Sequence, residues 1–197
     1  NGTWVDVPGM GIGSDRCRSS VILLAPILYR MKKAAVVEPG GCSIGRAQLI
    51  FTCMSFRRLA SSFIMNGRNT SLHRPIIFAV LTFLEISISG ATEQAILAAV
   101  TANGMTVIDN AAREPEIAEL CRMLRGMGAK ITGDQTGRIV IEGVKELFES
   151  TCEVSADRIV AATCLSAVAV CSGEITLTGV DASHLNGVIE PFEKMGW

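Results

Sequence analysis

The same pattern of apolar and polar residues occurs twice in the second half of the chain. The two copies cover 90–133 and 156–197. Each begins with an alanine-rich stretch whose apolar residues recur at helical spacing, followed by a short β-rich run, "MTVIDN" or "EITLTG". Each ends on a second amphipathic stretch that stops at a Met-Gly pair. The pattern therefore predicts helix, strand and helix in both copies.

Glycines and further β-rich runs extend this prediction. Gly104 and Gly173 stand where a left-handed residue would close the first helix of each copy. After the first copy, "AKITGDQ" and "GRIVIEGV" predict two strands joined by a polar turn. A partial third copy fits the start of the chain, with a helix in "SSVILLAPILYRM" and a strand in "AAVVEP".

Repeated units that each bury one helix face predict a symmetric α/β domain with its helices packed inside. A generic α/β protein with similar helices is the alternative, and the matching order of the glycine and Met-Gly positions favours the repeat. Residues 46–88 do not follow the plan, because arginines interrupt their apolar runs and neither periodicity is clean.

Composition narrows the class of protein. The chain has 197 residues, 49% of them hydrophobic, and can therefore bury a sizeable core. Its net charge of −1 gives no indication of binding to nucleic acid or to a membrane surface. The chain has seven irregularly spaced cysteines, two histidines and no CxxC motif. This pattern argues against a zinc site or a disulfide framework. It favours cysteines that are core residues of a protein in a reducing cytoplasm. The apolar run Val21–Leu28 is too short to span a bilayer, and a chain that begins at Asn1 suggests a fragment.

Three short stretches carry candidate chemistry. Cys42 follows two glycines, which let a loop bring a thiol close to a ligand, although a lone cysteine is weak evidence by itself. Arg18 precedes a predicted helix, where a guanidinium can bind phosphate or carboxylate, or simply be solvated. Ser89 and Gly90 open another helix, whose backbone N–H groups can hold a diphosphate; equally, Ser89 or Thr92 can merely cap it.

Four segments together resemble the UDP-N-acetylglucosamine 1-carboxyvinyltransferases, a family of enolpyruvyl transferases in peptidoglycan synthesis. They are "RSSVILLAPILYRMKKAAVVEPGGCSIG", "SGATEQAILAAV", "NAAREPEIAELCRMLRGMGAKI" and "ADRIVAAT". The resemblance implies an inside-out α/β barrel of two domains, each of three βαβαββ units. Residues 1–197 would form most of one domain, with the second domain mostly absent and the chain alone inactive.

The resemblance also implies roles. Cys42 would be the general acid toward phosphoenolpyruvate, able to form a covalent adduct and to react with fosfomycin. Arg18, Arg46, Ser89 and Gly90 would contact phosphoenolpyruvate or UDP-N-acetylglucosamine, and no metal or organic cofactor is implied. Glu114 and Glu116 flank a proline, and we interpret them as helix-start residues and not as an acid–base pair. Asp157 is predicted to begin a helix in the same way.

The chain departs from the family directly after Gly45. The family continues Gly-Ala-Arg-Pro, whereas here Arg46 is displaced by one position and the proline is missing. Removing one nucleotide from a family-like coding sequence yields all eight residues of 46–53, so we hypothesise a frameshift that begins at Arg46 and is restored before Gly90. Two other functions stay open: a non-catalytic remnant of the fold, and the sister transferase of the shikimate pathway, which lacks this cysteine loop.

Overall fold

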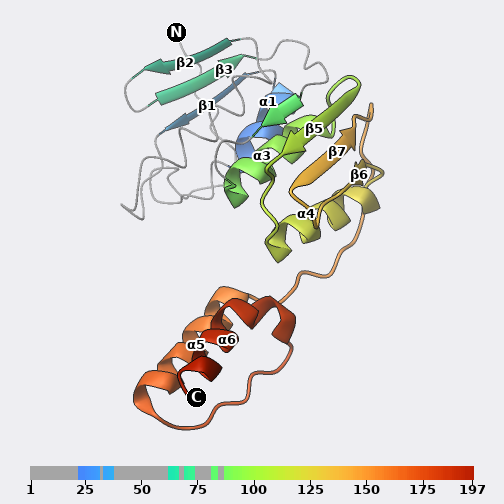
Figure 1. Ribbon diagram of the computed structural model, residues 1–197. Helices are drawn as coiled ribbons and strands as arrows, with labels where there is room; N and C mark the ends of the chain where they lie inside the picture. Colours follow the sequence, from blue (N-terminus) through green and yellow to red (C-terminus); the bar gives the residue numbers. More distant parts are fainter. Residues whose placement is uncertain (1–21, 32, 38–61, 67–68, 74–80, 84–86) are drawn as a thin grey trace. The chain divides into compact units, whose positions relative to one another are not determined.

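The computed structural model describes residues 22–31, 33–37, 62–66, 69–73, 81–83 and 87–197 (Figure 1). The chain divides into two compact units, 1–151 and 152–197, and each is described by itself. In the part of the chain so described, no helix combines the length and the apolar character needed to cross a membrane.

The first unit begins with a helix and a small sheet. Helix α1 spans Leu24–Met31 and leads into β1, Lys33–Val37, which confirms the helix and the strand predicted near the start of the chain. Strands β2, Ser62–Asn66, and β3, Asn69–His73, complete an antiparallel sheet in the order β1-β3-β2. Regular strands thus occur inside 46–88, where the apolar pattern alone does not reveal them.

A complete βαβαββ unit follows in the first unit (Figure 1). It consists of β4 (Leu81–Phe83), α3 (Ser89–Ala99), β5 (Met105–Asp109), α4 (Pro115–Gly126), β6 (Lys130–Thr132) and β7 (Arg138–Glu142). The sheet order is β4-β5-β7-β6; β4 and β5 are parallel, and β7 runs antiparallel to both β5 and β6. The helix, strand, helix and paired strands predicted from the pattern are confirmed.

The sheet of this unit is buried on one face only. Ile108 of β5, Ile131 of β6 and Ile139 and Ile141 of β7 are buried, and their neighbours along each strand are more exposed. The exposed face carries cross-strand ion pairs, Lys130–Glu142 at 2.6 Å and Arg138–Asp109 at 3.3 Å. Helices α3 and α4 therefore cover the apolar face, with the polar face of the sheet outward.

The two helices differ in how much of their surface is buried. α3 is buried on nearly every side, because it contacts α1 and α4 as well as β5 and β7. α4 is amphipathic and buries Ile117, Cys121 and Leu124, while Arg122 and Arg125 are exposed. α4 ends at Gly126 and is followed by the C-cap residue Met127 and by Gly128 at a φ of 96°, as the Met-Gly pair predicts.

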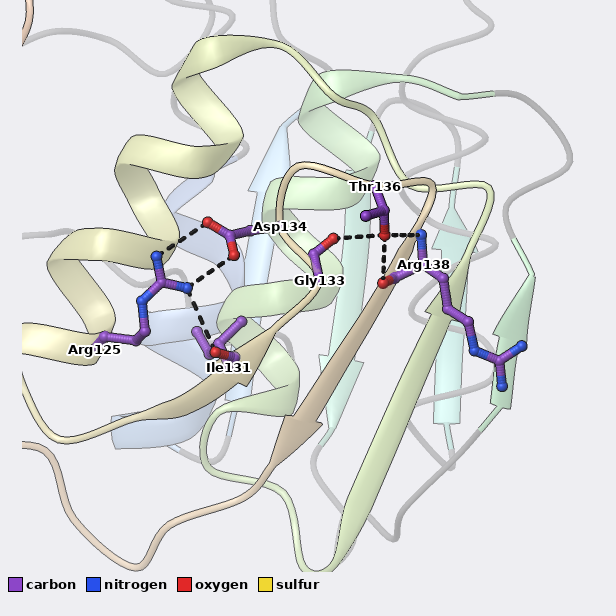
Figure 2. A network of polar contacts seen from close by, with 6 residues as sticks. All are labelled: Arg125, Ile131, Gly133, Asp134, Thr136 and Arg138. Atoms are coloured by element: carbon purple, nitrogen blue, oxygen red, sulfur yellow. Dashed lines mark hydrogen bonds and ion pairs between the residues drawn. The ribbon is translucent and has the colours of Figure 1, made fainter.

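A polar network ties the end of α4 to the β6–β7 turn (Figure 2). Arg125 donates from both terminal nitrogens to the carboxylate of Asp134, at 2.9 and 3.0 Å, and also to the carbonyl of Ile131 at 3.4 Å. This pairing lowers the pKa of the Asp134 carboxyl, with the hydrogen bond from Arg125 as the main cause. Within the turn, the Thr136 hydroxyl contacts the carbonyls of Gly133 and Arg138 at 2.9 and 3.0 Å. These contacts fix the packing of α4 on its own strands.

The second unit contains α5 (Arg158–Cys171), the 3-10 helix η2 (Ala182–Leu185) and α6 (Asn186–Lys194). Asp157 caps α5 by accepting from the N–H groups of Ile159 and Val160, which confirms the predicted helix start. The strand predicted at "EITLTG" is wrong: residues 174–179 form no strand, because nothing described in this unit pairs with them. Gly196, at a φ of 90°, follows α6 as predicted.

Of the two glycines predicted to close the first helices, one is displaced and one lies at the helix end. α3 ends at Ala99 and is followed by Val100 in a right-handed conformation, so Gly104, at a φ of 90°, serves the turn into β5. α5 ends at Cys171, and Gly173, at a φ of 141°, directly follows the C-cap residue Ser172, whose φ is also positive at 60°. Only α3 thus ends earlier than its glycine indicates.

Candidate functional site

The candidate site residues are divided between described and undescribed parts of the chain. Cys42, Arg18 and Arg46 lie outside the described residues. Ser89 and Gly90 are the first two residues of α3, as the sequence predicts. The site can therefore be built from the N-terminal end of α3 and from what surrounds it.

The topology brings two helix starts to one edge of the sheet. α3 follows the carboxyl end of β4, and α4 follows the carboxyl end of β5. Since β4 and β5 are parallel neighbours, both helices start at the same edge. Ligands of α/β proteins commonly bind at the carboxyl ends of parallel strands, where helix N-termini supply N–H donors and partial positive charge.

A side-chain hydrogen bond joins the two helix starts. The Ser89 hydroxyl donates to Oε1 of Glu114 at 2.9 Å, and Glu114 is the residue that precedes the first turn of α4. Glu116 lies in that first turn, which confirms the interpretation of both glutamates as helix-start residues. The Ser89–Glu114 hydrogen bond therefore sets the spacing between the two N-terminal ends.

Neither candidate hydroxyl caps α3. The N-cap position is Ile88, without a side-chain cap, and the first helical bond runs from the N–H of Thr92 to the carbonyl of Ile88 at 3.0 Å. Thr92 is fully buried, and its hydroxyl accepts from the N–H of Ala112 at 3.0 Å. The alternative that Ser89 or Thr92 serves as a helix cap is thus wrong. The N–H groups of the first turn have no acceptor within the helix.

Gly90 leaves open space beside these N–H groups. A Cβ built on Gly90 would meet no heavy atom within 4 Å. Gly90 is part of a regular helix, so its lack of a side chain is not required by the backbone conformation. A missing side chain with room around it permits close approach of a ligand to the backbone. The arrangement suits an anionic group such as a phosphate.

Three glutamates, Glu93, Glu114 and Glu116, place negative charge near the start of α3. Glu93, one turn into α3, has a raised pKa; burial is the main cause, followed by the charges of Glu116 and then Glu114. Among the residues that the structure describes, no group of three or more acidic, histidine or cysteine side chains is arranged to hold a metal ion. The charges of Glu116 and Glu114 thus act on Glu93 near the two helix starts.

The described cysteines are all free: Cys121, Cys152, Cys164 and Cys171. Cys121 is fully buried, and burial raises the pKa of its thiol to about 12, so it is an unreactive core residue, as predicted. Cys171 differs from that prediction, because it is exposed at the end of α5.

Sequence reasoning misses one residue near this site. Gln94 is buried within the otherwise apolar part of α3, with 1% of its surface exposed. Its side-chain oxygen accepts from the N–H of Ala25, in the first turn of α1, at 3.3 Å. A polar residue in the middle of an alanine-rich helix is the signal that could have identified it.

Comparison with known proteins identifies the family to which the chain is similar. The model of a family described as EPSP synthase (3-phosphoshikimate 1-carboxyvinyltransferase) matches residues 14–197. A UDP-N-acetylglucosamine 1-carboxyvinyltransferase of Endomicrobium trichonymphae is 40% identical over 183 residues, which are 92% of this chain and 44% of that protein. One of Nocardia farcinica is 42% identical over 180 residues, 91% of this chain and 42% of that protein. The chain thus spans less than half the length of these relatives.

Solved structures agree on the fold. The enolpyruvyl transferase NikO from Streptomyces tendae matches with a TM-score of 0.71 at 16% identity, over 91% of this chain and 44% of that chain. An EPSP synthase from Acinetobacter baumannii matches with a TM-score of 0.66 at 21% identity, over 91% of this chain and 41% of that chain. The predicted α/β class of the enolpyruvyl transferase type is confirmed.

Proposed function

The chain belongs to the EPSP synthase (3-phosphoshikimate 1-carboxyvinyltransferase) family, and from this premise we propose that it is part of an enolpyruvyl transferase acting on UDP-N-acetylglucosamine. The relatives that carry this activity in their names are 40% and 42% identical to it. The enolpyruvyl group of phosphoenolpyruvate would pass to the sugar 3-hydroxyl, with release of phosphate. The product would serve peptidoglycan synthesis.

One observation of the structure carries the choice of an anionic substrate. The start of α3 combines first-turn N–H groups that have no acceptor within the helix with open space at Gly90, at the edge where two parallel strands end. Nucleotide sugars present a diphosphate, which suits this end of the helix. Ser89 is held by Glu114, so the backbone around Ser89 and Gly90 would make the contact.

The remaining roles follow from the motifs. Cys42, in "PGGCSIG", would protonate the methylene carbon of phosphoenolpyruvate while the sugar oxygen loses its proton to a base and bonds to the neighbouring carbon. Phosphate would leave in a later step together with a proton from the resulting methyl group, which restores the carbon–carbon double bond. Arg18 and Arg46 would neutralise substrate charge.

Binding and labelling of the full chain test the proposal. We expect saturable binding of UDP-N-acetylglucosamine by calorimetry, weaker or no binding of shikimate 3-phosphate, and fosfomycin labelling at Cys42. Cys42→Ser is the matched control, and the exposed Cys171 is the internal control for non-specific alkylation. No detectable turnover is expected from this chain by itself.

Two other results would each favour a different function for the chain. Preferential binding of shikimate 3-phosphate would favour the sister transferase, whose name the family model carries. Absence of both binding and labelling would favour a non-catalytic remnant of the fold.

A further inference from the structure

The N-terminal half of α3 contacts three other segments through polar side chains. Ser89 reaches the start of α4, Thr92 holds Ala112 before that helix, and Gln94 accepts from Ala25 in α1. The first two contacts tie α3 to the next helix in the chain. The contact of Gln94 joins residues 69 positions apart and orients α1.

Gln94 supplies an acceptor to the start of α1 from another helix. Ala25 is the second residue of α1, which a 3-10 turn at residues 22–23 directly precedes, and its N–H donates to the Gln94 side chain. Ala25 is 4% exposed, and water is therefore a poor substitute for an acceptor. Gln94, itself buried, supplies the oxygen from another helix.

This contact lies close to the candidate anion site. Gly90 and Gln94 are four residues apart, which corresponds to about 6 Å along a helix axis. The first turn of α1 therefore packs beside the second turn of α3, about one turn from the open space at Gly90. A second contact holds the other part of α1, where the Tyr29 hydroxyl donates to the carbonyl of Lys145 at 3.2 Å.

We propose that Gln94 is a positioning residue of the anion-binding end of α3, because its amide oxygen fixes the first turn of α1 against that end. The inference rests on the proposed function, since it concerns affinity for the nucleotide sugar. Gln94 acts through Ala25 and does not itself contact the ligand.

The first test measures the contact itself. In Gln94→Met the side chain keeps its approximate size and loses the acceptor, and we expect amide hydrogen exchange at Ala25 to rise about 5-fold or more, measured by NMR on the labelled full chain. Gln94→Glu keeps an oxygen acceptor and should restore most of the protection. Exchange at Ala25 that is the same in Gln94→Met as in the wild type would overturn the inference.

The second test measures function. We expect Gln94→Met to weaken binding of UDP-N-acetylglucosamine about 5-fold. Ile131→Val, in β6 and away from α3, is the control for a general loss of stability and should leave the affinity unchanged. Gln94→Glu is used only for exchange, because a new carboxylate would itself repel the diphosphate.

The possible failures are distinguishable. If the wild type binds and Gln94→Met binds equally well, Gln94 has only a structural role and the inference is wrong. The same conclusion holds if Ile131→Val weakens binding as much as Gln94→Met does. If the wild type does not bind UDP-N-acetylglucosamine, the proposed function fails, and the positioning role fails with it.

Discussion

Ser89 donates its hydroxyl proton to Oε1 of Glu114 at 2.9 Å, and this bond links the first residue of α3 to the residue before α4. The two helices start after neighbouring parallel strands, so the bond crosses the edge where a ligand would bind. Because the Ser89 proton is engaged, what this end offers an anion is the backbone N–H groups of α3.

Removing either partner of this bond should reveal the coupling. We expect Ser89→Ala and Glu114→Ala each to lower the free energy of unfolding, with a coupling energy of about 1 kcal/mol in a double-mutant cycle measured by urea denaturation. The bond is partly buried, so its strength should exceed that of an exposed pair. Additive effects of the two substitutions would contradict the coupling.

Gly90→Ala should separate stability from binding. The new Cβ meets nothing within 4 Å, and alanine favours a helix over glycine, so unfolding should cost up to about 0.5–1 kcal/mol more. Affinity for UDP-N-acetylglucosamine should fall, because the methyl group fills the space of the ligand. Thermal denaturation and calorimetry on the same variant measure both effects. A more stable variant with unchanged affinity would argue against ligand approach at Gly90.

Two buried threonines should respond to the same substitution with opposite signs. Among the side chains that the structure describes, the Thr106 hydroxyl is the buried group without a hydrogen-bond partner. Thr106→Val should therefore stabilise the protein by about 1 kcal/mol. Thr92→Val should destabilise it by about 1–2 kcal/mol, because the N–H of Ala112 loses its acceptor. Urea denaturation of both variants checks the pair, and an equal shift in both would contradict it.

Glu93 should make stability depend on acidic pH. Its pKa is raised above the ordinary 4.5, so the native state binds this proton more tightly than the unfolded state does. The contribution of Glu93 to stability is therefore fully present below pH 4.5 and is lost as the pH rises through the raised value. Glu93→Gln should stabilise the protein at pH 7, by less than about 1 kcal/mol because the side chain is partly solvated.

The gain from Glu93→Gln should shrink as the pH falls and should vanish once both states are protonated. Denaturation curves between neutral and acidic pH measure it. Glu149→Gln, at an exposed position of the same unit, controls for the removal of one negative charge. A gain that is constant with pH would show that titration of Glu93 is not its source.

The local elements of the βαβαββ unit could be read from the sequence because each depends on near neighbours. Helical spacing around Ile96 correctly predicts α3, and the alternation through Ile139 and Ile141 correctly predicts β7. The Met127-Gly128 pair correctly predicts the end of α4. The strand at 174–179 was wrong, because a strand exists only when another segment pairs with it. The sequence predicts that the helix ends at Gly104, whereas α3 ends at Ala99, and several residues separate that end from the glycine.

For the candidate site, the amino-acid sequence is sufficient to identify the family motifs and to place Ser89 and Gly90 at a helix start. It does not settle whether Ser89 and Thr92 cap that helix, and it does not reveal Gln94. These points depend on the folded arrangement, since the partners are Glu114, Ala112 and Ala25, which lie 20 or more positions away in the chain. Periodicity reports which face of a helix is buried, whereas a hydrogen bond between distant segments depends on how the helices pack.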